Sequence, residues 1–307
     1  MVGRRSWILF ALLSAAWGAS YMFIKIGLEH GLPAPAIVFW RTALAAAVLM
    51  PVAVRMGALA DLRSRLVPVV VLALVQVAAP FLLITFGERH ISSSLAGILV
   101  ATAPIFTFLL AFAIDQEERT GAIGVLGVGA GIGGVVLLLG VDTSGTAAAL
   151  LGGLMVVLAS LGYALGSYYL KRRFKDTQPV GVVAATMTAS ALLSAPFAAL
   201  DLPAHAPGGG AIAAVSTLGV VGTGIAFVMF YELIATVGPA KATLVAYLAP
   251  GFAVVYGVLL LGEKFTLATA AGLVLIIVGS WLAAEGRLPR FRARSAAGAL
   301  ARRAPQL

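Results

Sequence analysis

The stretch "LVAYLAPGFAVVYGVLLLGEKFT", residues 244–266, is an almost wholly apolar run that contains Pro250 and, near its end, Glu263. An earlier stretch, "ILVATAPIFTFLLAFAIDQEERT", residues 98–120, has the same plan with Pro104 and Glu117. In each stretch the glutamate follows the proline by 13 residues, and each residue of the second pair lies 146 residues after its counterpart. The match indicates that one structural unit is present twice in the chain.

The composition is that of a protein surrounded by lipid. Of the 307 residues, 61% are hydrophobic and only 11% are charged, whereas a soluble domain has roughly 45–50% apolar and about 25% charged residues. So few charges cannot cover a globular surface that faces water. The chain has no cysteine, which excludes a disulfide framework and a thiolate metal site.

A membrane-spanning helix needs about 20 mainly apolar residues. The chain is predicted to contain ten such runs, at residues 6–28, 35–55, 66–87, 92–114, 121–140, 150–171, 179–199, 211–234, 240–262 and 266–285. The first run could instead be a signal peptide, but it is too long for the apolar region of one. We therefore expect an all-α membrane protein with ten transmembrane helices.

The offset of 146 residues extends along most of the chain. It pairs Trp17 with Tyr163, an aromatic for an aromatic, and it joins several identical residues: Ser14 and Ser160, Lys25 and Lys171, Pro33 and Pro179, Thr42 and Thr188, Thr120 and Thr266, and Gly133 and Gly279. Each unit has five spans, an odd number, so the second unit enters the membrane from the opposite side. The expected fold is two inverted five-helix repeats, with a cytoplasmic N-terminus (1–7), a first repeat (8–140), a second repeat (150–284) and a basic cytoplasmic tail (286–307).

Lys and Arg residues predict the orientation, because they are enriched in cytoplasmic loops. With the N-terminus inside, 17 of the 21 basic residues lie on the inner side, and four lie on the outer side: Lys25, Arg41, Arg89 and Lys264. Both termini are therefore expected in the cytoplasm, in a multi-pass protein of the inner (plasma) membrane. Because the positive charge is spread over several inner segments as a topology signal, no nucleic-acid partner is expected.

Candidate substrate-binding residues lie near the middle of the predicted helices, and they are Trp17, Gln76, Thr102, Tyr163 and Tyr247. Inverted-repeat transporters bind their substrates near the membrane midplane, between the repeats. The Gln76 amide must find polar partners, so it is expected to face the bundle or a wet cavity. For the aromatic residues, plain helix packing is the alternative.

Pro104 and Pro250 fall at matching depth, near the middle of their helices. A proline removes a backbone donor and interrupts the helix, so these two are the candidate gating residues. The alternative is that each only bends its helix, since proline is frequent in membrane helices.

Lys25, Lys171 and Arg41 lie near the ends of predicted spans. They could attract an anionic or zwitterionic substrate to the vestibules, or simply extend to the headgroups. Glu117 and Glu263 stand at tight turns, where each is expected to accept hydrogen bonds from amides that begin the following helix. No acidic or histidine residue falls at mid-depth: Glu88 and most others lie in loops or at span ends, and the deepest acid, Glu232, lies about one turn from the inner end of its span. Proton coupling through a central carboxylate is therefore not predicted.

The glycine-rich run "GAIGVLGVGAGIGGVVLLLG", residues 121–140, contains Gly127 with Gly131 and Gly129 with Gly133 at GxxxG spacing. Such faces allow helix backbones to approach closely. The favoured partner is the last predicted helix through Gly279, and a second protomer is the alternative.

The chain contains no zinc-protease, nucleophile-elbow or phosphate-loop motif. We therefore expect no enzymatic activity, no cofactor or metal site, and no ATP-driven transport by this chain alone.

Four segments give the chain a resemblance to the EamA family of the drug/metabolite transporter superfamily. They are "WGASYMFIK" (17–25), "FWRTALAA" (39–46), "ATAPIFTFLLAF" (101–112) and the opening stretch (244–266). The first copy departs from the pattern, because "AIDQEE" replaces the expected L-G-E. The resemblance implies ten helices with both ends in the cytoplasm, and usually the export of small metabolites such as amino acids.

The expected function is thus secondary transport of a small molecule, in the direction of efflux and by alternating access. The alternatives are an uptake permease of the same fold and a non-transporting membrane subunit or sensor. The expected partners are the small-molecule substrate and the lipid bilayer, with the protein as a monomer or homodimer.

Overall fold

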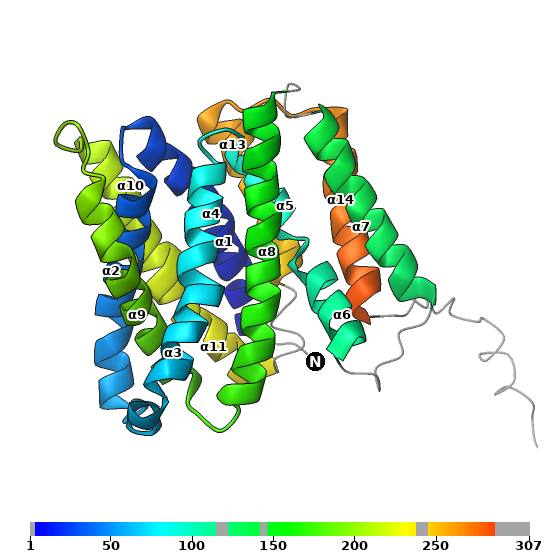
Figure 1. Cartoon of the computed structure of the whole chain (residues 1–307). Helices are drawn as coiled ribbons and strands as arrows, with labels where there is room; N and C mark the ends of the chain where they lie inside the picture. Colours follow the sequence, from blue (N-terminus) through cyan, green and yellow to red (C-terminus); the bar gives the residue numbers. More distant parts are fainter. Residues whose placement is uncertain (1–3, 115–121, 142–145, 238–244, 286–307) are drawn as a thin grey trace, which may run out of the picture.

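The computed structural model describes residues 4–114, 122–141, 146–237 and 245–285, and its elements there are helices (Figure 1). Within these residues, eight helical segments are long and apolar enough to cross a membrane, and Val245–Leu261 and Leu267–Ala283 are shorter apolar helices. Each of the ten predicted runs falls on one of these segments. The all-helical membrane fold is confirmed to that extent.

The first half of the chain contains α1 (Arg4–Glu29), α2 (Ala34–Arg55), η1 (Ala60–Arg65), α3 (Leu66–Leu72), η2 (Ala73–Ala78), α4 (Ala79–Gly87), α5 (Ser93–Val100), α6 (Ala103–Ile114) and α7 (Ala122–Val141). The second half contains α8 (Ala147–Arg173), α9 (Pro179–Leu200), α10 (Gly209–Gly219), η3 (Val220–Ile225), α11 (Ala226–Val237), α13 (Val245–Leu261) and α14 (Leu267–Glu285). The elements η1 to α4 form one continuous span, as do α10 to α11.

Two of the spans change helix type at corresponding places. Segments η2 and η3 are π-helical turns in the middle of the third and the eighth span. A π-turn places one extra residue in the helix and is often found at functional sites. Nothing in the apolar pattern of these spans predicted either turn.

The two halves of the chain interleave. Helix α2 packs against α9, α7 against α14, and α1 against α13, while α8 packs against α4 and α5. In Figure 1, α7 and α14 lie together at one edge of the bundle. Each half therefore depends on the other for its buried surfaces.

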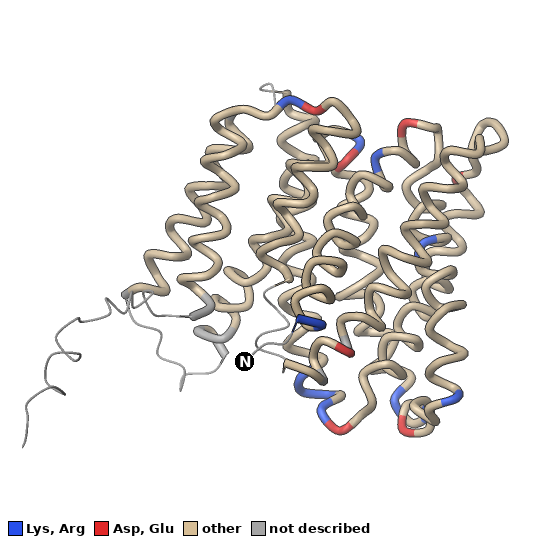
Figure 2. The backbone as a smooth tube through the Cα atoms, turned by 180° about the vertical axis from the view of Figure 1, so that it is seen from behind, with Lys and Arg blue, Asp and Glu red and all other residues tan. Residues whose placement is uncertain are grey.

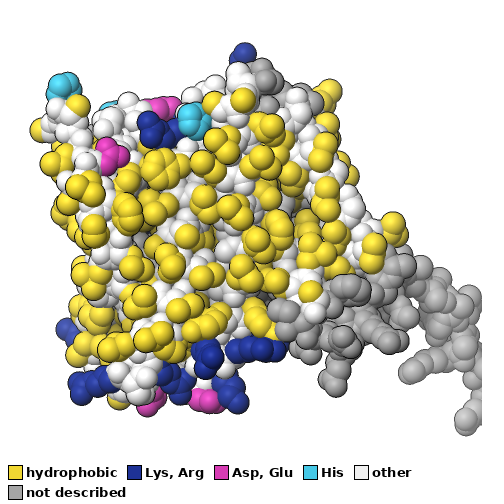
Figure 3. All heavy atoms as spheres, viewed as in Figure 1, with side chains coloured by type: hydrophobic (Ala, Val, Ile, Leu, Met, Phe, Trp, Pro, Cys, Tyr) yellow, Lys and Arg dark blue, Asp and Glu magenta, His cyan; other side chains and the backbone are white. Residues whose placement is uncertain are grey.

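A broad hydrophobic band covers the middle of the molecule (Figure 3). Most charged residues gather at the two ends of the bundle (Figure 2). The end at which α1 begins and α8 ends, here called the basic end, carries Arg4, Arg5, Arg55, Lys171, Arg172 and Arg173. We call the other end, at which α1 and α4 end, the opposite end.

Glycines bring α7 and α14 into backbone contact. A Cβ atom added to Gly127 would lie 2.6 Å from the Gly279 carbonyl oxygen, and one added to Gly279 would lie 2.5 Å from the Gly131 amide nitrogen. This confirms Gly279 of the last helix as the partner. Gly129 and Gly133 point elsewhere, with no described atom within 4 Å of an added Cβ.

A carboxylate joins the end of α13 to the start of α5. Glu263 Oε1 accepts hydrogen bonds from the Ser93 amide (2.7 Å) and the Ser93 hydroxyl (2.8 Å). Its Oε2 accepts from the Ser94 amide (3.0 Å) and the Ser94 hydroxyl. The preceding Gly262, at φ +66°, reverses the chain so that the carboxylate faces α5.

The expectation that Glu263 binds the start of the helix that follows it is therefore wrong. The first turn of α14 is capped by Thr266, whose hydroxyl accepts from the Thr269 amide at 3.0 Å, so Glu263 is available to cap α5. Its counterpart Glu117 lies outside the described residues.

Lys25 makes a second connection at this end. Its ammonium group donates to the carbonyl oxygens of Glu88 (2.8 Å) and Ile91 (3.1 Å), which tie α1 to the loop between α4 and α5. We call the two connections, through Lys25 and through Glu263 with its two serines, the clasp. It holds α1, α5 and α13 together at the opposite end of the bundle.

The glycine contact yields a test with a matched control. Gly127→Ala should lower the free energy of unfolding by about 1–3 kcal/mol, because its methyl group meets backbone atoms that cannot move aside. Gly129→Ala, on the same helix, should leave stability unchanged or raise it slightly, since alanine is the better helix former. Thermal unfolding of the two purified variants in detergent would measure this, and equal stabilities would contradict the packing described.

The clasp predicts that Glu263→Gln destabilises the protein. The amide nitrogen of glutamine would face the Ser93 or the Ser94 donors, so charge-assisted hydrogen bonds worth roughly 1.5–3 kcal/mol are weakened. Asp201→Asn, at an exposed carboxylate, is the control and should unfold at the wild-type temperature. If both variants unfold like the wild type, the four contacts contribute nothing.

Candidate functional site

Arg41 is a cation buried inside the bundle. Its residue is 8% exposed, and its Nε donates to the Thr223 hydroxyl at 3.0 Å. Thr223 lies in the π-helical segment η3, and its own hydroxyl donates to the Leu218 carbonyl at 2.9 Å. At about 1.5 Å per residue, Arg41 lies roughly 5 Å from the midpoint of α2. A charge therefore sits close to the centre of the apolar layer.

Aromatic side chains surround this charge. The Arg41 guanidinium lies over the Phe81 ring of α4, 3.7 Å from its centroid, an attractive arrangement for a cation. The charge also interacts electrostatically with the phenol groups of Tyr21 on α1 and Tyr163 on α8. We call Arg41, Thr223, Phe81, Tyr21 and Tyr163 the Arg41 cluster.

The Arg41 cluster contains no carboxylate in ion-pair contact with the guanidinium. Among the described residues the one ion pair joins Arg5 and Glu232, at 2.9 Å and largely exposed. A buried charge without an opposite partner is costly, and ionisable groups within membrane spans commonly mark functional sites. The cluster is therefore an anion-binding candidate built from α1, α2, α4, α8 and η3.

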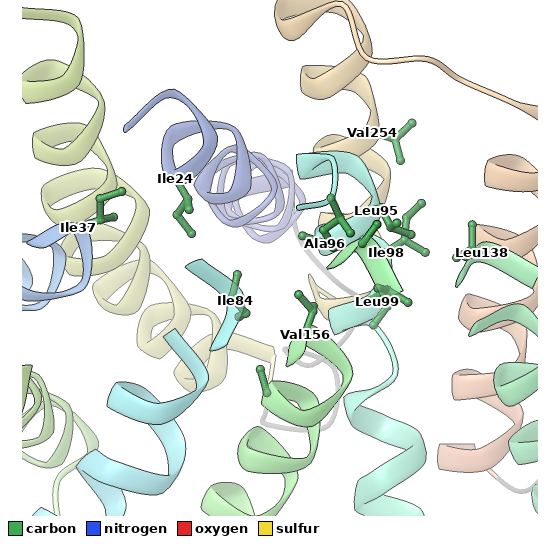
Figure 4. Close-up of a cluster of buried hydrophobic side chains, with 14 of the residues drawn as sticks. Ile24, Ile37, Ile84, Leu95, Ala96, Ile98, Leu99, Leu138, Val156 and Val254 are labelled. Carbon is green, nitrogen blue, oxygen red and sulfur yellow. The ribbon is translucent and has the colours of Figure 1, made fainter. Parts of the chain in front are cut away.

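Glu88 is the second buried ionisable group. It follows α4 directly, its side chain is fully buried, and both carboxyl oxygens lack a hydrogen-bond partner in the described structure. Ile84, one turn earlier, belongs to the apolar cluster drawn in Figure 4 with Ile98 and Val254. Burial raises the pKa of Glu88 well above its usual range. The nearby Lys25 acts to lower this pKa, Glu263 acts to raise it further, and Arg41 acts to lower it.

The position of Glu88 at a span end was predicted correctly, but its burial was not. Just before Glu88, Gly87 packs so closely against α8 that an added Cβ would lie 2.6 Å from the Gly152 carbonyl oxygen. A residue at the end of a helix is therefore enclosed by its neighbours.

The fourth span is interrupted next to Pro104. Helix α5 ends at Val100 and α6 begins at Ala103. Hydroxyl groups reach the carbonyls around the break. Ser280 of α14 donates to Ala101 (2.6 Å), and the Ser160 hydroxyl of α8, which has one hydrogen to donate, lies 3.3 Å from the Leu99 oxygen, 3.4 Å from the Val100 oxygen and 3.3 Å from the Val156 oxygen of its own helix. Non-helical backbone at membrane depth needs such partners or a water-filled cavity.

The corresponding span of the second half differs. Pro250 lies inside α13, which continues through it without interruption, so the expected break occurs at Pro104 and not at Pro250. Helix α1 packs tightly along this region, and a Cβ on Gly18 would lie 2.7 Å from the Ala249 carbonyl oxygen. Ser14, the counterpart of Ser160, is buried on α1, and its hydroxyl has no hydrogen-bond partner within the described segments.

The five predicted substrate-binding residues do not form one group. Tyr163 of α8 belongs to the Arg41 cluster. Gln76 lies in η2, and its amide nitrogen is 3.5 Å from the hydroxyl of Ser167, which follows Tyr163 by one turn of α8. Trp17 packs against Phe227 and Phe230 of α11, with ring centroids 6.1 and 5.2 Å away.

The hydroxyl of the buried Thr102 donates to the Leu99 carbonyl at 2.7 Å. Tyr247 is half-buried on α13, three residues before Pro250. Both therefore lie at the proline regions, one in each half of the chain.

The three predicted vestibule charges occupy three different environments. Lys25 belongs to the clasp, Lys171 is exposed at the basic end, and Arg41 is buried. The matched positions of Lys25 and Lys171 thus have different surroundings in the two halves.

Sequence reasoning missed Tyr21, Thr223 and the hydroxyl role of Ser160. Tyr21 had a usable signal, since it lies four residues from both Trp17 and Lys25 and so shares their helix face. Thr223 and Ser160 were single small polar residues in apolar runs, which carry no such signal.

Comparison with known proteins places these features in a family. Residues 5–140 and 150–284 both match the EamA-like transporter family. The inner membrane transporter YedA of Escherichia coli K12 is 31% identical over 266 residues, covering 84% of this chain and 83% of YedA. A probable terminal-alkyne amino-acid exporter of Streptantibioticus cattleyicolor is 27% identical over 305 residues, covering 97% of this chain and 99% of that protein.

A crystal structure also shares the fold. It aligns with a TM-score of 0.64 at 21% identity, over 91% of this chain and 96% of its own length. The resemblance noted in the sequence is therefore confirmed, and the bilayer and a small-molecule substrate follow from it as partners. The chain is a multi-pass membrane protein that belongs to the EamA-like transporter family.

Proposed function

We propose that this protein exports small metabolites that carry a carboxylate group, amino acids among them. The observation that carries the proposal is Arg41, a buried cation with no described carboxylate in ion-pair contact. A guanidinium group suits a carboxylate because it presents paired donors in a planar fork. Tyr21 and Tyr163 supply hydroxyl groups beside it.

The other predicted residues complete the proposed path. Gln76 and Tyr163 lie along the same side of α8, so they belong to one wall of the substrate route. Trp17, Thr102 and Tyr247 are assigned to positions that the substrate passes when the bundle rearranges. Lys25 and Lys171 attract the anionic group at the two ends of the route.

The relatives support the direction of transport. One is named as an exporter of an amino acid and aligns with 97% of this chain. We place the basic end in the cytoplasm together with both termini, following the positive-inside rule. The clasp then closes the external end.

Alternating access is proposed to work through an exchange of conformations between inverted halves. The fourth span is broken beside Pro104, where the Ser160 hydroxyl lies near its carbonyls, while the ninth is continuous through Pro250 and the Ser14 hydroxyl has no hydrogen-bond partner in the described part of the chain. In the opposite access state we expect the ninth span to open near Tyr247. The Ser14 hydroxyl would then donate a hydrogen bond to a carbonyl group freed by that opening. Pro104 and Pro250 are thus the paired gating residues of the mechanism.

Export can be tested directly with Arg41 variants. Cells preloaded with isotope-labelled amino acids should release at least one of them faster than cells without the protein, as read by mass spectrometry of the medium. Arg41→Gln should slow release by roughly 10–100-fold, because a charged hydrogen-bonding partner worth about 1.5–3 kcal/mol is lost. Arg41→Lys should also be slow, since an ammonium group does not reproduce the fork.

Arg89→Gln is the control, at an arginine exposed in the loop between α4 and α5 at the opposite end of the bundle. It should transport at the wild-type rate. Normal release by correctly inserted Arg41→Gln would remove Arg41 from the substrate site. No release by the wild type would refute amino-acid export, and net accumulation would favour an uptake permease.

The serine pair tests the exchange of conformations. Ser160→Ala should lower the unfolding temperature, because the hydrogen bond that its hydroxyl donates at the break, worth about 0.5–1.5 kcal/mol, is lost. Ser14→Ala should not lower it, since that hydroxyl has no partner among the residues that the structure describes, yet it should slow release of the same amino acid. The proposed exchange of conformations between the halves is contradicted if Ser14→Ala lowers the unfolding temperature as much as Ser160→Ala while transport stays normal.

A further inference from the structure

Glu88 is enclosed on every side that the described residues define. Its residue is 0% exposed, and its carboxyl oxygens have no hydrogen-bond partner among them. Gly87, immediately before it, is in contact with the backbone of α8. Ile91, three residues after it, is also buried. The carboxyl group therefore has no route to water while this end of the bundle stays closed.

The charged and titratable groups that act on Glu88 come from several packed elements. They are Lys25 and Tyr21 on α1, Arg41 on α2, with Tyr163 of α8 beside it, and Glu263 after α13. Lys25 uses its ammonium on the carbonyls of Glu88 and Ile91, not on the carboxyl group. Glu263 is bound to four serine donors.

None of these neighbours stabilises an ionised Glu88 by a hydrogen bond. A buried carboxylate that accepts no hydrogen bond is strongly disfavoured and takes up a proton instead. Burial accordingly raises the pKa of Glu88 well above its usual range. The closed structure is thus one in which this carboxyl group is neutral.

We propose that Glu88 is a proton-binding site linked to the clasp: the closed end holds one proton on this carboxyl group, and opening that end releases it. The proton passes to water on the side that opens, and no other bond is made or broken. This deepens the alternating-access proposal, because it requires that the clasp end can open.

The pH dependence follows from linkage. In the open state the carboxyl group meets water and titrates near the ordinary glutamate pKa of about 4.3. The closed state is therefore favoured at acidic pH, below the glutamate pKa of the open state. This preference is lost as the pH rises from the open-state pKa through the raised pKa of the closed state. Between these two values the ratio of open to closed protein rises by up to about tenfold per pH unit.

The experiment uses a single cysteine, since the chain has none of its own. Val254 of α13 is 8% exposed and packs in the apolar cluster beside the clasp helices (Figure 4). Val254→Cys should be shielded from an impermeant maleimide added outside intact cells at acidic pH, and labelling should increase as the external pH rises. Labelling of the denatured protein at each pH is the reference, so that ionisation of the thiol itself cancels.

The same cysteine is then combined with two neutralised acids. Glu88→Gln should keep labelling low at every pH, because its side chain cannot ionise when it is exposed. Glu29→Gln, at an exposed acid of the same end, should follow the parent curve. A Glu88→Gln curve that rises with pH like the parent curve overturns the proposal.

Infrared spectroscopy of the purified protein gives a measurement that needs no transport. The carbonyl stretch of a protonated carboxyl group should be present in the wild type at neutral pH and absent in Glu88→Gln. If that variant fails to fold, the wild-type band must still titrate over the pH range in which labelling rises, and a missing band refutes the site. If labelling depends on pH and on Glu88 but no amino acid is released, the proton site is supported and the proposed substrate is rejected. If amino acids are released but labelling does not depend on pH, the proposed substrate is supported and the proton site is rejected.

Discussion

Hydrocarbon offers no hydrogen bonds, and the described structure follows from that constraint. At two places where a span departs from a regular helix, a neighbouring span supplies a donor: Ser190 of α9 donates to the Ala73 carbonyl in η2, and hydroxyl groups reach the break between α5 and α6. The break between α5 and α6 is the clearest case, because hydroxyl groups from α8 and α14 reach its carbonyls. The break therefore depends on the second half of the chain, and the halves are joined where each is irregular.

The two buried ionisable groups show opposite solutions to the same constraint. Arg41 cannot lose its charge, so the protein places it against an aromatic ring and a threonine hydroxyl. Glu88 can become neutral, so it tolerates an enclosure that provides no donor. A permanent charge with no ion-pair partner among the described residues is suited to hold a ligand of opposite sign, whereas a group that gains and loses its charge is suited to report a conformational state.

The asymmetry between the halves is as informative as their similarity. Both contain a π-turn in the third of their five spans. They differ at the proline, where one span is broken and the other is continuous, and at the matched serines: Ser160 is bonded, and the Ser14 hydroxyl has no partner among the described residues. This difference between the halves supports the alternating access proposed above, in which they exchange conformations.

The apolar runs determined most of the fold, because helix length and lipid contact are local properties of the chain. The ten segments and the glycine contact of α7 with α14 could both be read from spacing. Packing decided what spacing could not. Glu263 caps a helix about 170 residues away in the chain, and Glu88 is buried although it stands at the end of a span. Both depend on which segments meet in three dimensions, and hydropathy carries no information about that. The same reason explains why Tyr163 joined the Arg41 cluster while Trp17, its counterpart in the repeat, packed against α11.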